Sequence, residues 1–350
     1  MDDLREKIAR LDRELLERAS ERVELARQLG QWKREHQLPT IDFAQERVVL
    51  ERARSIAGEL GLDATLAEDL VARLVRASVS VQDEERLRLS ALGAGRTAII
   101  AGGAGRMGRW LDRFLSSLGY RTGVLDPAAD PAEHSLARAA LAGADLIVCS
   151  TPPATTGVIY DHWCEAPPPG VIFDVSSIKT PLVEPIRRLQ RAGGHVASIH
   201  PMFGPQIDLL RDADVVICDT GDAKAAAVVE RLFSPTTARL VRLPLEEHDR
   251  IMADLLSLAH GAAIAFALAL PEAEHVVRST TFRVLETLAG NVVRESADVY
   301  YEIQAMNPHS KAAIDRLRDA LERVADAVER RDSKAFRGLM DEGRRRTPER

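Results

Sequence analysis

Apolar side chains recur every three or four positions along residues 4–29, which is typical of one face of a long amphipathic helix. The positions are Leu4, Ile8, Leu11, Leu15, Ala19, Val23, Ala26 and Leu29. Gly30 weakens this pattern only slightly. A break over residues 36–42 precedes a second helical pattern at about 43–58 and a third at about 62–89, with Thr65 as its expected N-cap. We therefore predict an all-helical domain over residues 1–90. One long and two shorter helices cannot bury their apolar faces alone, so we expect an intertwined helical dimer.

The pattern changes after residue 96. Seven short apolar runs alternate with turns or helical patterns, at 97–101, 122–125, 145–149, 171–175, 195–199, 214–218 and 239–243. This alternation predicts a doubly wound, mostly parallel sheet of Rossmann type over residues 97–243. From 244 to 346 the pattern is helical again, which predicts an all-helical domain that pairs with its symmetry mate. The fold class is thus multidomain: all-α, then α/β, then all-α.

A glycine-rich turn follows the first apolar run. Gly103, Gly105 and Gly108 give the spacing G-x-G-x-x-G. In that motif the first glycine permits a tight turn, the second lets a pyrophosphate approach, and the third lets helix pack on strand. Arg106 and Met107 would open the helix, whose N-terminal N–H groups favour phosphate.

An acid in the expected place strengthens the case for a dinucleotide. Asp126 ends the second apolar run, where it would accept hydrogen bonds from the adenosine ribose and favour NAD. The nearby Arg121 leaves NADP open. The alternative is an ordinary glycine turn of an α/β protein, but the order strand, turn, helix, strand, acid favours a cofactor site.

Other strand ends carry polar residues. Parallel sheets bind ligands at the carboxyl ends of their strands. Three loops there hold Ser150 and Thr151, then Asp174, Ser176, Ser177 and Lys179, then His200 before a proline. A histidine in that position suits a general base near neutral pH, although a lone histidine is more often structural.

Charged residues of the first helix have a helical relationship. Arg22 and Lys33 are separated by eleven residues, so they lie within about 20° of one face and about 16 Å apart, where both can reach a dianion. Arg5 points away from both and suits a neighbouring helix. Asp42 with Glu46, and Ser78 with Gln82, share a face as i,i+4 pairs. A solvated charged helix is the alternative.

The first ninety residues resemble the all-helical chorismate mutase domain. LREKI at 4–8, ERVELA at 21–26, the lysine at 33 and SVSVQ at 78–82 carry this resemblance. It implies that Arg5 of a partner chain, Arg22 and Lys33 hold the carboxylates and ether oxygen of chorismate. It also implies that Asp42, Glu46 and Ser78 surround the hydroxyl, while Gln82 faces the ether oxygen.

The remaining chain resembles prephenate dehydrogenase. DVSSIK, SIHPMFGP, EEHDRIMADLLSLAH and TFRVLE carry the resemblance, and the order of domains is that of the bifunctional chorismate mutase–prephenate dehydrogenase family. It implies that His200 is the catalytic histidine, that Ser177 shares its hydrogen bond, and that Lys179 stands in the same pocket. His260 and Arg283 would line the substrate side.

Two positions depart from that pattern. Gln45 stands where the family usually has an arginine, and no arginine follows Arg283 before Arg294. Two alternatives therefore stay open. The pockets could take the 4-amino analogues of chorismate and prephenate, or the first domain could be a non-catalytic module that dimerises or regulates.

The overall composition limits the classes of molecule that the protein is expected to bind. A net charge of −6 gives no reason to expect nucleic acid or an anionic membrane. The three cysteines, Cys149, Cys164 and Cys218, have no metal-ligand spacing and indicate buried thiols in a reducing cytoplasm. The charged N-terminus does not resemble a signal peptide. The uncharged run 255–271 is short for a membrane span and is predicted to be a core or dimer helix.

Overall fold

The computed structural model describes residues 2–36, 38, 42–207, 210, 213–272 and 277–347. Its N-terminal part is the expected set of three helices, α1 (Asp2–Glu35), α2 (Phe43–Leu60) and α3 (Ala64–Ser90). Asp63, rather than Thr65, caps α3, since its carboxylate accepts the Leu66 N–H at 2.9 Å. Asp63 directly precedes the first helical residue and can act as the N-cap, whereas Thr65 lies two places later, within the helix.

Gly30 has a packing role that its helical position conceals. A Cβ at Gly30 would lie 2.6 Å from Cγ of Gln82 on α3. The glycine thus lets α1 and α3 approach closely, and the Gln82 amide then donates to the carbonyl of Ala26 at 2.8 Å.

The outer face of α1 is uncovered in a single chain. Leu4, Ile8, Leu11 and Leu15 are each more than half exposed. A continuous apolar ridge of this length marks an interaction surface rather than a solvated face.

The middle of the chain forms one seven-stranded sheet in the order β2-β1-β3-β4-β5-β6-β7. All seven predicted strands are confirmed: β1 (Thr97–Ala101), β2 (Arg121–Leu125), β3 (Leu146–Cys149), β4 (Val171–Asp174), β5 (His195–Pro201), β6 (Asp214–Asp219) and β7 (Arg239–Pro244). β5 and β6 run antiparallel and the other neighbouring strands run parallel.

Helices cover both faces of the sheet, so the expected doubly wound architecture is confirmed. α4 (Arg106–Ser117) and α8 (Ala223–Phe233) pack on one face. α5 (Pro131–Ala140), α6 (Pro153–Trp163) and α7 (Val183–Arg191) pack on the other. Two short 3₁₀ turns, η1 (Leu141–Gly143) and η2 (Thr180–Leu182), precede β3 and α7.

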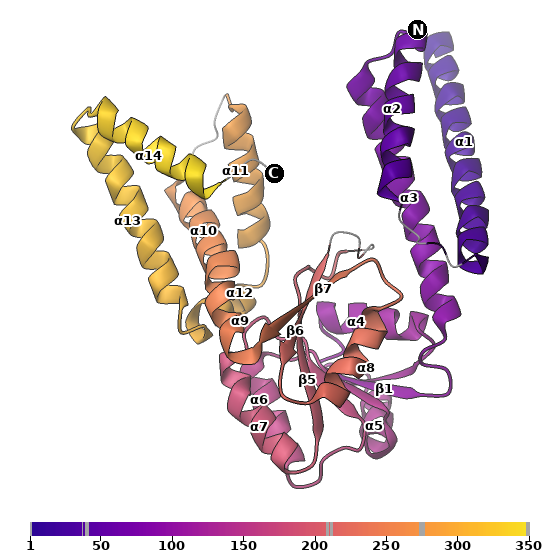
Figure 1. The fold of residues 1–350 in the computed structure, drawn as a ribbon, viewed down its shortest axis with the longest axis vertical. Coiled ribbons are helices and arrows are strands. Elements are labelled where there is room, and N and C mark those ends of the chain that lie inside the picture. The colour runs from indigo at the N-terminus through magenta and orange to yellow at the C-terminus, as the bar shows by residue number, and fades with distance from the viewer. Residues whose placement is uncertain are drawn as a thin grey trace.

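The C-terminal part is helical, as predicted. It contains α9 (Leu245–Met252), the π-helical segment η3 (Ala253–Leu258), α10 (Ala259–Ala269), α11 (Thr280–Val293), α12 (Ala297–Met306), α13 (Ser310–Glu329) and α14 (Ser333–Arg346). Figure 1 shows these helices rising on one side of the sheet and α1 to α3 rising on the other. The continuous segment Leu245–Ala269 is long and apolar enough to span a membrane by length and composition.

A tightly packed linker joins α3 to the sheet. A Cβ at Gly93 would lie 2.2 Å from the ring of Tyr120, and the Gly93 N–H donates to the Leu118 carbonyl at 2.8 Å. The chain therefore leaves the last turn of α3 in a fixed direction.

Candidate active sites

The glycine turn connects β1 to α4 as the sequence predicts. Gly105 is the N-cap of α4 and no side chain caps the helix, so its first N–H groups remain available to a phosphate. A Cβ at Gly108 would lie 2.3 Å from the Gly102 carbonyl oxygen, which confirms its role in helix–strand packing. The tight turn is made by Gly102, whose φ is +78°, and not by Gly103 as expected.

Asp126 lies beside this turn and Arg121 does not. The Asp126 carboxylate accepts the Ala104 N–H at 3.1 Å and so holds the glycine loop. Arg121 begins β2 and pairs in register with Thr97 at the amino end of β1. Because the two strands are parallel, its side chain starts from the edge of the sheet opposite the glycine loop. Arg121 is therefore not the neighbour of Asp126 that the sequence suggested.

A cavity of about 580 Å³ lies at the carboxyl ends of the strands. Its walls include Gly105, Arg106 and Met107 from the glycine turn, Ser150 and Thr151 after β3, Ser176 and Ser177 after β4, and His200 in β5. The predicted loops thus meet in one pocket beside the glycine turn. The C-terminal helices close it with residues that include His260, Glu295 and Tyr300.

His200 is the buried end of a hydrogen-bonded chain. Its Nδ1 lies 3.1 Å from Nε2 of His248, and Nδ1 of His248 lies 2.7 Å from the carboxylate of Asp249. A carboxylate only accepts, so His248 carries its proton on Nδ1 and receives the Nδ1 proton of His200 on Nε2. This arrangement leaves the Nε2 lone pair of His200 as its proton acceptor.

The surroundings keep His200 neutral. Burial, the neighbouring His248 and the Lys179 ammonium lower the pKa of His200 well below 6.5. Burial also lowers the pKa of His248, although its hydrogen bond to Asp249 opposes this. Burial raises the pKa of Asp249, but hydrogen bonds from His248, Thr180 and the Lys179 N–H outweigh it and lower that pKa. The group facing the pocket is therefore a base and not a cation.

Lys179 is not in the pocket, contrary to expectation. Its side chain is fully buried, and its ammonium donates to Asp174 at 2.7 Å and to the Ile199 carbonyl at 2.7 Å. An ammonium that is out of contact with water needs such partners, and a strand-end aspartate and a carbonyl supply them. Lys179 thus fixes the loop after β4 against β5, immediately before His200.

A bridge crosses from the glycine turn to the C-terminal helices. The Arg106 guanidinium pairs with the carboxylate of Glu295, which lowers the pKa of Glu295. Gln206 donates to the same carboxylate at 3.4 Å. Arg283 and Arg294 do not line this cavity in a single chain. The expected substrate arginine is therefore not supplied by either residue within the described part of this chain.

His260 does reach the pocket. It follows the π-helical segment, its Nδ1 is buried, and its ring packs against Tyr300 with centroids 4.5 Å apart. Burial lowers the pKa of His260, so it also presents a neutral ring. Ser177 lines the same cavity, but His200 is hydrogen-bonded to His248 and not to Ser177.

A second group of predicted residues meets between α1 and α3. Arg22 donates to Ser78 Oγ at 2.7 Å and to the Leu74 carbonyl at 2.9 Å. Burial lowers the pKa of Arg22. Gln82 is buried one turn beyond Ser78. The two helices therefore place a guanidinium, a hydroxyl and an amide along one seam.

The other residues of that group occupy less buried positions. Lys33 and Glu46 are half-buried on α1 and α2. Asp42 is exposed and caps α2, since its carboxylate accepts the Gln45 N–H at 3.0 Å. Arg5 is exposed near the free end of α1, where its charge pairs with Asp2. Within a single chain, Arg5 does not lie beside Arg22. Arg5 could therefore reach the substrate site of Arg22 only from a partner chain, which is the role expected for it.

Sequence reasoning missed His248, Asp249, Glu295 and Tyr300. The first two lie within a segment whose resemblance was noted without a role for them. Their spacing from His200 gives no local signal, because only the folded chain joins α9 to β5.

Comparisons with known protein families match the helical N-terminal part, the sheet and the helical C-terminal part of the chain separately. A family described as chorismate mutase type II matches residues 4–83, and the prephenate dehydrogenase nucleotide-binding domain matches residues 109–242. A family described as the TYRAAT1-like C-terminal domain matches residues 273–338.

Individual relatives agree with these matches. T-protein of Enterobacter agglomerans is 28% identical over 341 residues, covering 95% of this chain and 89% of its own length. The 4-amino-4-deoxyprephenate dehydrogenase of Streptomyces pristinaespiralis is 29% identical over 264 residues, covering 70% of this chain and 88% of its own. The fold is similar to the structure of Aquifex aeolicus prephenate dehydrogenase in complex with hydroxyphenyl propionate and NAD+, with a TM-score of 0.56, 17% identity, and coverage of 72% and 97% of the two chains.

Proposed function

Since this chain belongs to the family that fuses chorismate mutase to prephenate dehydrogenase, we propose that it catalyses both reactions in sequence. Residues 1–90 would convert chorismate to prephenate. Residues 97–243 and 244–346 would together oxidise and decarboxylate prephenate to 4-hydroxyphenylpyruvate. The observation that carries the proposal is the neutral His200, at the end of its hydrogen-bonded chain, in a cavity that borders the glycine turn.

The mutase reaction requires placement of charge and no proton transfer. A pericyclic rearrangement is accelerated when the substrate is held compactly and the breaking ether bond meets fixed donors. Arg22 and Lys33 would hold the substrate carboxylates, with Arg5 of the partner chain. Gln82, fixed by its bond to Ala26, would face the ether oxygen. Ser78, Asp42 and Glu46 would surround the hydroxyl.

The dehydrogenase cavity suits a dinucleotide. The uncapped N-terminus of α4, the close approach at Gly108 and the carboxylate of Asp126 match the pyrophosphate and ribose of NAD. Gly103, Gly105, Arg106, Met107, Ser150 and Thr151 complete the binding surface. When bound, NAD+ accepts a hydride from the ring carbon that carries the hydroxyl.

The chain's own residues handle the proton. His200 Nε2 takes the hydroxyl proton as the carbonyl forms, while His248 and Asp249 hold the ring in position and stabilise its transient charge. The ring carboxylate then leaves as CO₂, the electrons of the broken bond make the ring aromatic, and the resulting phenolate oxygen takes the proton back from His200. Ser177 and His260 would contact the substrate from two sides of the cavity, and Lys179 would keep the loop of Ser177 in place.

We assign NAD rather than NADP to this cavity. Asp126 would repel a 2′-phosphate, and Arg121 starts from the far edge of the sheet, where it cannot compensate. A ratio of kcat/KM for the two cofactors that strongly favours NAD+ is the expected result.

We also propose a cytoplasmic homodimer. The ridge on α1 and the apolar surface of α10 and α11 would be covered by a second copy. Segment 245–269 is assigned to this helical core rather than to a membrane, because its first turns deliver His248 and Asp249 to a buried site. Three free cysteines are compatible with a reducing compartment.

One assay tests both activities. Purified protein with NAD+ is given chorismate or prephenate, and NADH absorbance is followed. NADH from both substrates is the expected result. NADH from prephenate alone would mean a non-catalytic first domain, for which Gln45→Arg is the variant to try. No NADH from either substrate, in protein that binds NAD+, would contradict the proposal.

The 4-amino substrates are the second candidate. The Streptomyces relative acts on such a compound by its name, and Gln45 and the absent arginine lie where substrate contact is expected. The Glu295 carboxylate in the cavity wall is also compatible with an amino group. A comparison of kcat/KM for the 4-hydroxy and 4-amino compounds at each site distinguishes the two candidate functions.

A further inference from the structure

The long helical segment that begins at Leu245 contains one irregular turn. Residues 253–258 are π-helical, between the α-helical turns of α9 and α10. No step of the proposed reactions uses this turn. Single π turns inside α-helices are rare, and many of them occur at functional sites. The residues on either side of this one belong to the dehydrogenase site, since His248 precedes it and His260 follows it.

The π turn changes which residues share a face of the helix. His248 and His260 are twelve positions apart, which in a regular α-helix would separate them by about 120° around the axis. A π turn takes up about one residue more than an α turn, so the separation falls to about 20°. Both side chains accordingly serve one cavity: His248 is bonded to His200 in its wall, and His260 lines it directly.

Two side-chain amides from the end of α12 hold this turn. Ahead of the turn, the Asn307 amide donates to the carbonyl of Asp249 at 2.7 Å. Near the end of the turn, the Gln304 amide donates to the carbonyl of Ser257 at 3.1 Å. Ser257 is itself fully buried, and its hydroxyl lies 2.6 Å from that of Ser310 on α13. The π turn is therefore fixed at both ends against neighbouring helices.

The same helix α12 provides the surface on which His260 rests. Tyr300 lies one helical turn before Gln304, and its ring packs against the His260 ring with centroids 4.5 Å apart. Tyr300 and Ile303 also line the cavity. α12 thus holds the π turn with two amides and packs against the histidine that follows it. A shift of the helix by one residue would rotate His260 by about 100° and take it off this surface.

We propose that Gln304 and Asn307 are positioning residues of the dehydrogenase: they hold the π turn, and the π turn places His260 beside His248 on the side of the substrate. This role rests on the proposed dehydrogenase function of the cavity. Among the described residues, the cavity wall includes His260 but neither of the two amides, so both act through the histidine. Loss of either amide should weaken substrate binding without removing a group that touches the substrate.

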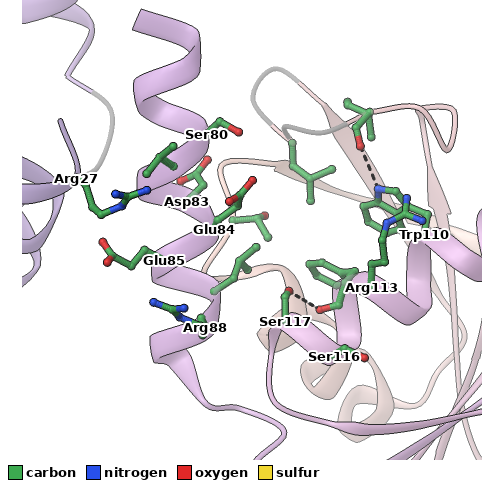
Figure 2. A pocket seen from close by; sticks show the side chains of 16 residues that line it. Arg27, Ser80, Asp83, Glu84, Glu85, Arg88, Trp110, Arg113, Ser116 and Ser117 are labelled. Atoms are coloured by element: carbon green, nitrogen blue, oxygen red, sulfur yellow. Dashed lines mark hydrogen bonds between the residues drawn. The ribbon is translucent and has the colours of Figure 1, made fainter. Parts of the chain in front are cut away.

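The mutase domain offers an internal control, because it joins the sheet elsewhere. A hydrogen bond of 2.9 Å from Thr237 to Asp83 ties α3 to the loop before β7. Next to this bond, a cavity of about 730 Å³ separates Glu84 on α3 from Arg113 on α4 (Figure 2). The N-terminal helices and the C-terminal helices rise on different sides of the sheet (Figure 1). Substitutions at the π turn should therefore leave mutase kcat/KM unchanged.

A double-mutant cycle tests the route through His260. Gln304→Met keeps the length of the side chain and removes the donor, so KM for prephenate should rise about fivefold or more while kcat stays within about threefold. In a His260→Asn background the same substitution should add less than about twofold, since the residue through which it acts is gone. Gln190→Met is the matched control. The Gln190 amide also donates to two backbone carbonyls, those of Val196 and Thr220, but it does not line the cavity, and this variant should have parent-like kinetics.

A second measurement needs no turnover. Diethyl pyrocarbonate modifies neutral imidazole rings, and peptide mass spectrometry gives the rate at each histidine. His260 should react about fivefold or more faster in Gln304→Met and in Asn307→Leu than in the parent, because it loses the cover of Tyr300. The exposed His162 should react equally in all three proteins.

Two results would overturn this role. One is a rate at His260 that stays within about twofold of the parent in both variants. The other is an effect of Gln304→Met on KM that persists in full in the His260→Asn background. The reactivity of His260 is measured without substrate, so failure of the proposed reaction would not be mistaken for failure of the π turn to position this residue.

Discussion

His248 Nε2 lies 3.1 Å from His200 Nδ1, although the two residues come from different parts of the chain. His200 belongs to β5 of the sheet, and His248 belongs to α9 of the C-terminal helices. Because His248 is itself bonded to Asp249, the helical part of the molecule sets the tautomer of the base at the sheet edge. The dehydrogenase site is thus completed only when the two parts dock.

Removal of the base should reduce turnover. His200→Asn should lower kcat with prephenate by about 10²- to 10⁴-fold, with a smaller effect on KM, because the general base acts in the transition state. His248→Asn should lower kcat by about tenfold or more, since the base is then less well held. Steady-state kinetics checks both values, with the exposed His162→Asn as control. Parent-like turnover of His200→Asn would exclude the assigned role.

The pH dependence follows from the lowered pKa of His200. The folded-state pKa lies well below 6.5, so the base is neutral throughout the neutral range. We expect kcat to stay level as pH falls through 6.5 and to decline only at more acidic pH. A decline centred on 6.5 would indicate an ordinary exposed histidine.

The same pKa shift affects stability. Below pH 6.5 the unfolded chain binds a proton that folded His200 rejects, so the stability that His200 contributes is complete above 6.5 and is lost as pH falls from 6.5 toward its folded pKa. Urea midpoints should therefore decrease over this window. The decrease should be smaller in His200→Asn than in the parent.

Lys179 should be a stability residue. Lys179→Met leaves the fully buried Asp174 carboxylate without its cation and should lower the free energy of unfolding by about 3–5 kcal/mol. The double variant Asp174→Asn with Lys179→Met should recover part of that loss. Urea unfolding measures both, with the exposed Lys224→Met as control. A stable Lys179→Met protein with greatly reduced kcat would instead support a catalytic role.

Gly30 should matter to one activity and not to the fold. Gly30→Ala places a methyl group 2.6 Å from Gln82 Cγ, so the glutamine side chain must move and mutase kcat/KM should fall about tenfold or more. Helix propensity favours alanine by about 1 kcal/mol, which offsets the crowding. Gly58→Ala, where the added Cβ meets nothing within 4 Å, is the matched control. Equal mutase activity in the two variants would contradict the placement of Gln82.

The sequence was sufficient for the strands and the glycine turn because these depend on local patterns. Short apolar runs between turns predict buried parallel strands, and all seven are present. The position of Arg121 could also have been deduced, since a residue that opens a parallel strand lies at the edge opposite the ligand. Roles that depend on distant partners were not accessible. The ammonium of Lys179 is paired with Asp174 and Ile199, and only the folded sheet brings them together.

α3 runs without interruption from Ala64 to Ser90 and ends six residues before β1. Its last two turns pack against the sheet domain, while the preceding turn presents Gln82 to α1. A chimera that exchanges mutase domains between relatives should therefore not be joined at the linker. The exchanged piece would carry foreign residues at 83–90 onto an unchanged α4, so the functional crossover point lies inside the helix, directly after Gln82.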